Sequence, residues 1–233
     1  MAAEHLPDRP ALVVFDMAGT TVYDEDGIVA RCLVEAMESG GFVVEFSRAL
    51  SLMGIPKPEA IVHLLPETMQ HEPTLDQTVT QLHQAFLERM LRYYRENPAV
   101  TSIAGTEEVF RTLRTEGIKV ALDTGFSRDI LDTIVARLHW ESLLDATVAS
   151  DEVQNGRPHP DMVFYLMHQL GITDAAQVAK VGDTPVDLQE GLAAGCQWNI
   201  GVWEGSHTRE QLQGCPHTHL IPNIAHLPAL WNL

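Results

Sequence analysis

The strongest constraint on the fold is an apolar run near the amino end that stops at an acid. Residues 11–15 are Ala-Leu-Val-Val-Phe, followed by Asp16 and then by Met-Ala-Gly-Thr-Thr. Such a run predicts a strand buried on both faces, as in a parallel sheet. Because parallel sheets carry their chemistry at the carboxyl ends of strands, we expect the Asp16 carboxylate at the rim of a site, with Gly19 turning backbone N–H groups toward an anion. An ordinary strand and glycine turn explains this window equally well.

The composition is that of a globular, acidic protein. A chain of 233 residues with 45% hydrophobic content fits one large domain, or one domain with a small insertion. Its 15 Lys and Arg against 32 Asp and Glu give a net charge of −17, and no basic run offsets it. We therefore expect neither a nucleic-acid nor a membrane partner. Three cysteines without metal-ligand spacing, no apolar leader and no long apolar stretch predict a cytoplasmic location.

The hydrophobic spacing is purely helical over residues 23–100. One apolar stripe, Val29 to Met37, ends at the glycine pair at 40–41, and a second stripe over residues 79–91 stops at Asn97-Pro98. We interpret residues 23–100 as a helical cap inserted after the first strand, with hinges near 22–24 and 100–102. The exposed remainder of its stripes could make a homodimer contact. Residues 1–22 and 101–233 would form the core domain.

From residue 101 onward, helical and strand patterns alternate. Strands separated by helices of 10 to 15 residues indicate βαβ units. The expected fold class is therefore α/β, a doubly wound parallel sheet of Rossmann-like type that carries the all-helical cap. The expected strands are 118–122, 146–149, 178–181 and 198–202, and the expected helices are 107–116, 127–138, 161–170 and 185–194.

Polar residues follow the predicted strands at the points where a parallel sheet places its sites. Asp16, Thr124 and Asp183 come just past the ends of three strands, and Arg157 lies in a turn after a fourth. These ends open onto one crevice. Carboxylate oxygens suit Mg²⁺, and a guanidinium can grip phosphoryl oxygens with two hydrogen bonds. We expect a crevice that binds a divalent cation and the phosphoryl group of a small molecule.

Four segments together resemble the signature of the haloacid dehalogenase superfamily of phosphotransferases: residues 16–21, 123–125, 156–158 and 182–187. The resemblance implies that Asp16 is a nucleophile that becomes an aspartyl-phosphate. It also implies that Asp16, the Ala18 carbonyl and Asp183 hold Mg²⁺, supported by Asp187, and that Thr124, Gly125 and Arg157 hold the phosphoryl group. Asp187 has a second interpretation, as the first-turn acid of a helix that begins at Pro185, and the two roles are compatible.

Ala18 departs from the phosphatase pattern, which places an acid two residues after the nucleophile to protonate the leaving alkoxide. A phosphatase without this acid should be slower by a factor on the order of 10²–10⁴. Lys57, in the segment Met53-Gly-Ile-Pro-Lys, would on its own be a surface charge. Together, Ala18 and Lys57 resemble the phosphonatase branch, phosphonoacetaldehyde hydrolase and its relatives, in which a cap lysine forms a Schiff base with the substrate aldehyde. The carbon then leaves as an enamine, so no alkoxide needs a proton.

Two departures from the phosphonatase pattern leave the substrate open. The pattern has His where this chain has Ala60, and Tyr where it has Phe126, which with Met53 is expected near the pocket. A substituted phosphonoaldehyde is compatible with both changes. One alternative is a phosphomonoesterase of a small phosphometabolite, with its acid supplied by Asp24, Glu25 or the substrate. A second alternative, a non-catalytic phosphometabolite-binding protein, would not need the nucleophile.

A last pattern concerns metal binding near the carboxyl end. Cys215, His217 and His219 alternate and would share one face of a strand, but a fourth ligand is lacking. A metal site there is disfavoured.

Overall fold

The computed structural model describes residues 9–24 and 27–233. Within these residues, a single sheet of six parallel strands has the order β3-β2-β1-β4-β5-β6. The strands are β1 (Leu12–Phe15), β2 (Lys119–Thr124), β3 (Ala146–Ala149), β4 (Val178–Gly182), β5 (Trp198–Val202) and β6 (His219–Ile221). The order reverses at β1, which pairs with β2 on one side and β4 on the other. This is the switch point at which doubly wound sheets form their crevice.

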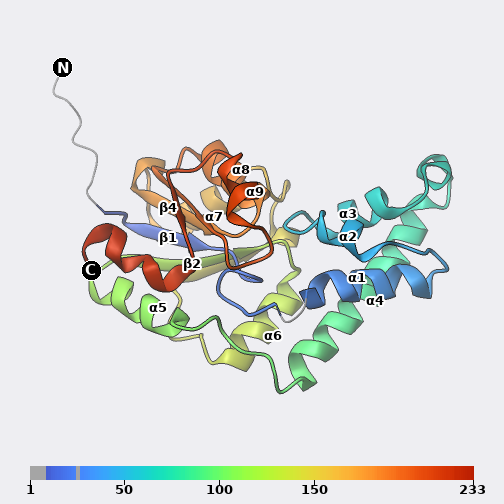
Figure 1. Ribbon diagram of the computed structural model, residues 1–233, viewed down its shortest axis with the longest axis horizontal. Helices are drawn as coiled ribbons and strands as arrows, with labels where there is room; N and C mark the ends of the chain where they lie inside the picture. The colour runs from blue at the N-terminus through green and yellow to red at the C-terminus, as the bar shows by residue number, and fades with distance from the viewer. Residues whose placement is uncertain (1–8, 25–26) are drawn as a thin grey trace.

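Helices cover both faces of the sheet, and this explains the apolar run of β1 (Figure 1). Leu12 and Val14 belong to the core beneath α7 (Asp161–Leu170) and α8 (Pro185–Ala194). Val13 and Phe15 belong to the opposite core, beneath α5 (Thr106–Thr115) and α6 (Arg128–Leu138). Because successive side chains of a strand point to opposite faces, a strand with two buried faces needs an apolar residue at every position.

Four helices lie between β1 and α5 and gather at one end of the molecule (Figure 1). They are α1 (Ile28–Ser39), α2 (Phe46–Leu50), α3 (Lys57–Leu64) and α4 (Leu75–Glu96). The first predicted stripe is buried in α1, which ends at Gly40, and α4 ends before Asn97 and Pro98. The all-helical insertion is thus confirmed. The long α4 packs against α1 and α3 and also against α6 of the core.

The two connections between the helical insertion and the sheet run side by side. The Tyr23 N–H donates to the Thr101 carbonyl at 3.0 Å, and Val22 forms an antiparallel bridge with Ser102. The domain boundaries at 22/23 and 100/101, and hinges near them, stay predictions.

The structure differs from the sequence expectation at two strands. β2 extends to Thr124, so that Asp123 and Thr124 belong to the strand instead of following it. The edge strand β6 was not expected, because three residues are too short to show an alternating pattern. Cys215 and His217 precede β6, so the expected shared strand face is wrong; the His217 ring Nδ1 lies instead 2.8 Å from the Cys215 carbonyl.

The remaining elements are short. They are α9 (Arg209–Gln213) and 3-10 turns at Glu67–His71, Ser150–Glu152, Ala175–Gln177, Ile224–His226 and Pro228–Trp231. Among the described helices, none combines the length and the apolar character needed to cross a bilayer.

Candidate active site

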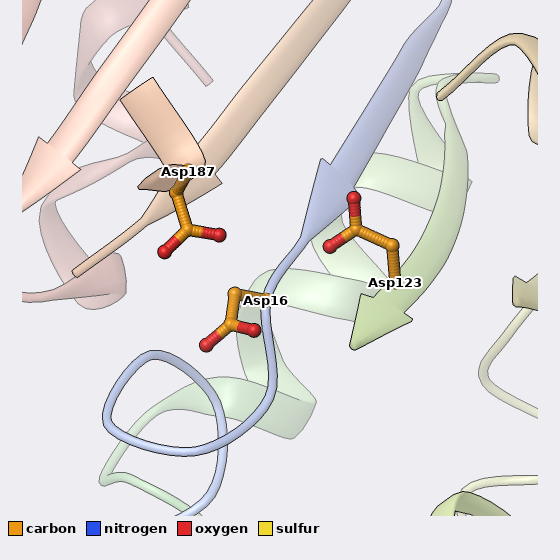
Figure 2. A group of neighbouring side chains, drawn as sticks. All are labelled: Asp16, Asp123 and Asp187. Atoms are coloured by element: carbon orange, nitrogen blue, oxygen red, sulfur yellow. The ribbon is translucent and has the colours of Figure 1, made fainter. Parts of the chain in front are cut away.

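The strand register brings three carboxylates to one place. Phe15 pairs with Leu122 of β2 and with Val181 of β4, so Asp16 leaves β1 level with Asp123. The third acid, Asp187, lies in the first turn of α8. One oxygen from each carboxylate lies within 4.8 Å of the other two. Figure 2 shows Asp187 and Asp123 turned toward each other, and Asp16, where the chain leaves β1, with its carboxylate directed toward the loop that follows.

Two buried cations neutralise part of this negative charge. The Arg157 Nη1 atom lies 2.7 Å from Asp16 Oδ1 and also pairs with Asp187 Oδ1. The Lys180 Nζ atom pairs with Asp123 and lies 3.3 Å from Asp187 Oδ1 and 3.0 Å from Glu190 Oε2. Arg157 is 2% exposed and Lys180 is fully buried. We call these residues the buried ion-pair chain: Asp16, Arg157, Asp187, Lys180, Asp123 and Glu190.

Asp187 has the helix-start role that its sequence position suggested, and its support of a metal site stays a prediction. Its N–H faces the Thr184 hydroxyl at 3.4 Å, and its Oδ2 accepts from the Thr184 N–H at 3.2 Å, which is a capping box at the start of α8. Burial acts to raise the pKa of Asp187, but Arg157 and Lys180 outweigh it and hold that pKa below its usual value. The helix start therefore fixes an ionised carboxylate against Arg157.

Asp183, just past the end of β4, makes no ion pair within the described residues. Its Oδ2 accepts from the Ser206 N–H at 2.6 Å and its Oδ1 from the Thr20 hydroxyl at 3.1 Å. Burial, followed by the charges of Asp16 and Asp187, raises the pKa of Asp183 to about 8. Burial also raises the pKa of Asp16 to about 6, against the opposing charge of Arg157. The site thus has more negative than positive charge.

This imbalance fits a divalent cation between Asp16 and Asp183. Two buried carboxylates and a backbone carbonyl such as that of Ala18 are hard oxygen donors of the kind that Mg²⁺ prefers. Asp123 and Asp187 lie close to Asp16, but Lys180 and Arg157 already compensate their charges. Among the acids around Asp16, Asp183 has no ion pair in the part of the chain that the structure describes, and the loop after β1 approaches it so closely that a Cβ on Gly19 would collide with its carboxylate.

A cavity next to these acids contains the cap lysine. Its walls include all the predicted substrate-facing residues: Asp16, Ala18, Met53, Lys57, Thr124, Gly125, Phe126 and Arg157. Lys57 is only 4% exposed, and its Nζ donates to the Ile55 carbonyl at 3.2 Å. Burial, followed by the charge of Arg157, lowers the pKa of Lys57 to about 8, while Asp16 and Asp24 act in the opposite direction. The structure therefore places an unusually acidic ammonium in the same cavity as Asp16.

Close backbone contacts explain why Lys57 faces the core. Gly54, with φ of +92°, lies against the start of α8: a Cβ there would collide with Val186 and would stand 2.7 Å from Thr184 Oγ1. A Cβ on Gly125 would stand 3.1 Å from the Gly54 carbonyl oxygen. The loop before α3 is thus seated on the core, and Lys57 is the first residue of the helix that follows it.

Sequence reasoning did not identify the other polar residues of the site. Lys180 has a signal in hindsight, because it interrupts an otherwise apolar strand. Ser206 and Thr20, which hydrogen-bond Asp183, lie in loops whose sequence gives no such signal. Asp24, considered only as an alternative acid, lines the cavity; Glu25 lies outside the described residues.

Comparison with known proteins agrees with this geometry. The model of the haloacid dehalogenase-like hydrolases matches residues 13–200. The chain belongs to this family. A phosphonoacetaldehyde hydrolase of Bordetella pertussis is 32% identical over 98% of this chain and 93% of its own length.

Solved structures of other haloacid dehalogenase-like hydrolases share the fold of this one. A phosphonoacetaldehyde hydrolase like protein from Oleispira antarctica superposes with a TM-score of 0.83 and 23% identity, covering 100% of this chain and 95% of the other. A protein from Haemophilus somnus, described as a predicted phosphoglycolate phosphatase, has a TM-score of 0.78 at 17% identity and covers 97% and 99% of the two chains. At these identities the likeness concerns the fold alone.

Proposed function

We propose that this hydrolase cleaves the carbon–phosphorus bond of phosphonoacetaldehyde or a related phosphonoaldehyde, in a Mg²⁺-dependent reaction with a Schiff base on Lys57 and an aspartyl-phosphate on Asp16. The observation that carries the proposal is the buried Lys57 amine in the cavity of Asp16, where Ala18 stands at the position of the acid that phosphatases use. The name of the Bordetella relative supports the same substrate class. Three free cysteines support a reducing compartment, and we propose the cytoplasm.

The proposed reaction begins at the lysine. With a pKa of about 8, a usable share of Lys57 is free amine at neutral pH. The amine adds to the aldehyde carbon, and loss of water leaves a protonated imine. Asp16 then attacks phosphorus while the electrons of the carbon–phosphorus bond move toward the imine nitrogen, which gives an enamine. Protonation and hydrolysis release the aldehyde from Lys57, and water hydrolyses the aspartyl-phosphate to phosphate.

The core residues have defined tasks in this proposal. Arg157, beside Asp16, would bind phosphoryl oxygens, together with the Thr124 hydroxyl and the Gly125 backbone. Asp16, the Ala18 carbonyl and Asp183 would hold Mg²⁺, with Asp187 fixing Arg157 from behind. When bound, the cation supplies positive charge that offsets the repulsion between a carboxylate and an anionic phosphoryl group.

Borohydride trapping tests the proposal sharply, because the chain has three lysines, Lys57, Lys119 and Lys180. Phosphonoacetaldehyde, Mg²⁺ and borohydride should give one reduced adduct, located on Lys57 by peptide mass spectrometry. Lys57→Met should abolish the adduct and turnover. Lys119→Met is the matched control, because this side chain is half exposed and pairs with Asp145 at a distance from the cavity. Adduct on Lys119 alone, or on no lysine, contradicts the Schiff base.

A phosphomonoesterase is the second candidate, favoured by one observation. Asp24 lines the cavity, and burial raises its pKa, so it could protonate an alkoxide in place of the missing acid. Rapid turnover of p-nitrophenyl phosphate or sugar phosphates by Lys57→Met would support this function over the phosphonatase. Phosphate binding without turnover of either substrate class would indicate a binding protein.

A further inference from the structure

Four ionisable side chains line the cavity in the part of the chain that the structure describes: Asp16, Asp24, Lys57 and Arg157. The proposed function uses three of them, as nucleophile, amine and phosphoryl ligand. Asp24 has no task in it. Asp24 also makes no ion pair within the described residues, unlike Asp16, which is held by Arg157.

Backbone hydrogen bonds hold the Asp24 carboxylate in the wall of the cavity that also contains Lys57. Its Oδ1 accepts from the Val29 N–H at 3.3 Å, in the first turn of α1. The Ile28 N–H is a second backbone donor to this carboxylate. Asp24 and Lys57 also influence each other's protonation, and among the residues that the structure describes Asp16 is the other anion that acts on the lysine. The charge of Asp24 also helps to raise the pKa of Tyr94, buried in α4, and of Cys32 in α1.

Imine chemistry needs a group that moves protons. The Lys57 ammonium must lose a proton before it attacks, and the carbinolamine oxygen must gain one before it leaves as water. Asp16 is unsuited to both steps, since it pairs with Arg157 and must stay free to attack phosphorus. Arg157 does not release protons in this range. By elimination among the cavity groups, Asp24 is the side chain that can do this work.

We propose that Asp24 is the proton-transfer residue for the Lys57 imine. Its carboxylate takes a proton from the Lys57 ammonium, the free amine adds to the aldehyde carbon, and Asp24 returns a proton to the carbinolamine oxygen. Asp24 then takes a second proton from the carbinolamine nitrogen and transfers it to the hydroxyl group, the carbon–oxygen bond breaks, water leaves, and the protonated imine remains. Atoms and charge balance without any further reactant. This inference rests on the proposed function.

Asp24→Asn separates proton transfer from structure. Asparagine keeps an oxygen that accepts from Val29 and Ile28, and it caps helices as well as aspartate does. The substitution should leave the melting temperature nearly unchanged, since the hydrogen bond to the first turn of α1 is kept. It should lower kcat for phosphonoacetaldehyde by on the order of 10²–10⁴, which is the usual contribution of a general acid or base.

Imine formation itself is measured in an Asp16→Asn background, where the carbon–phosphorus bond cannot break. Asp16→Asn and Asp16→Asn/Asp24→Asn are mixed with phosphonoacetaldehyde, quenched with borohydride at timed intervals, and analysed for adduct on Lys57. A proton-transfer residue changes the rate and not the final extent. We expect the double variant to reach the same extent at least about 100-fold more slowly.

A purely electrostatic effect of removing the Asp24 charge would not slow imine formation in the double variant. The Asp24 charge favours the ammonium form of Lys57, so its removal makes more free amine available and would speed addition. Equal rates in the two variants would overturn the inference and leave the proposed function standing. A loss of final extent, or of melting temperature, would also overturn it, because Asp24 would then be structural. No trapped imine in the unsubstituted enzyme would overturn the proposed function and this inference with it.

Discussion

At the scale of single residues, Asp16 has the most testable role. It is 5% exposed, paired with Arg157, and close enough to raise the pKa of Asp183. Asp16→Asn should keep the fold, because asparagine has the same volume and removes a repulsive charge from the site. Turnover should fall by at least about 1,000-fold, as for other covalent nucleophiles. Circular dichroism and steady-state kinetics measure both effects, and persistent turnover would rule out the covalent mechanism.

The Lys57 amine predicts a pH dependence. Only the free amine attacks an aldehyde, and burial lowers the pKa of Lys57 from 10.5 to about 8. The rate of imine formation in Asp16→Asn should therefore rise with pH to a plateau, with its midpoint somewhat below 8, because the substitution removes the Asp16 charge that favours the ammonium form. Timed borohydride quenching between pH 6 and 10 gives the profile, with Lys119→Met as the control. A midpoint near the ordinary lysine value would show that Lys57 is not buried in solution.

The sequence predicts which residues lie at the site, but it does not predict which of them pair with one another in the folded protein. Strand ends singled out Asp16, Thr124 and Asp183, because parallel strands bring their carboxyl ends to one edge. The sequence around Lys180 does not predict that its ammonium pairs with Asp123, Asp187 and Glu190, which lie on β2 and α8. A lysine within an apolar strand is unusual and so marks itself in the sequence. Its partners, however, depend on the strand register and on how α8 packs against the sheet. The roles assigned to the site residues stay predictions.

At the scale of elements, the contact between the loop before α3 and the start of α8 controls where Lys57 lies. In Gly54→Ala the new Cβ meets Val186 and Thr184, so the loop must move. Gly41→Ala is the matched control, because Gly41 also has a positive φ, of +86°, with nothing within 4 Å of a Cβ. Both variants lose about 1 kcal/mol of stability from the left-handed backbone.

Function should distinguish the two glycine variants. Gly54→Ala should lose kcat for phosphonoacetaldehyde by at least about tenfold, since a displacement of about 1 Å at a reacting group costs up to 10²-fold. Gly41→Ala should keep kcat within about twofold. Steady-state kinetics and urea unfolding measure the two properties, and equal kcat values for the variants would show that the loop contact does not position Lys57.

The buried ion-pair chain joins β1, β2, β4 and α8, and Lys180 is its central cation. Lys180→Met keeps the volume of the side chain but leaves Asp123 and Glu190 buried without a cation. Breaking a buried pair in this way costs about 3–5 kcal/mol. The triple variant Lys180→Met/Asp123→Asn/Glu190→Gln removes the orphaned charges and should recover most of that loss. Urea unfolding compares the two, and equal stabilities would mean that the chain's acids are already neutral in the native protein.

The regular elements were predictable because their signals are local. Periodicity and caps give α1, α7 and α8 nearly to the residue, and apolar runs give β1, β3 and β5. The extension of β2 to Thr124 was not predictable in this way, because Asp123 is a poor strand former whose burial is made possible by Lys180. The same cause, a partner distant in sequence, explains both the missed strand end and the missed lysine.

At the scale of the whole molecule, a net charge of −17 means that the anionic substrate we propose would need a locally positive site. Among the described residues of the site, three cations, Arg157, Lys180 and Lys57, stand against five acids, Asp16, Asp123, Asp183, Asp187 and Glu190, and burial raises the pKa of Asp16, Asp183 and Glu190. The Mg²⁺ that we propose would lower this negative charge as well as assist the chemistry. The expected homodimer contact through the cap stays a prediction, which sedimentation equilibrium would test.

The same imbalance predicts how stability responds to pH and metal. The pKa values of Asp183 and Asp16, about 8 and about 6 in the folded protein, both lie above the ordinary 3.8. Between pH 6 and 8 the folded metal-free protein keeps the Asp183 proton that the unfolded chain has lost, so the free energy of unfolding falls as pH rises. The slope is at most about 1.4 kcal/mol per pH unit. The opposite contribution of Lys57 lies between about 8 and 10.5, above this window.

Scanning calorimetry of the metal-free protein should therefore give a melting temperature lower by about 5–10 °C at pH 8 than at pH 6, at the few degrees per kcal/mol expected for a chain of this size. Mg²⁺ binds the ionised carboxylates, so it should raise the melting temperature more at pH 8 than at pH 6. Asp183→Asn, which cannot ionise, should flatten the pH dependence and remove most of the metal effect. A metal-free protein that becomes more stable from pH 6 to 8 would mean that Asp183 is ionised and already compensated, and that the site as described lacks the excess charge on which Mg²⁺ binding depends.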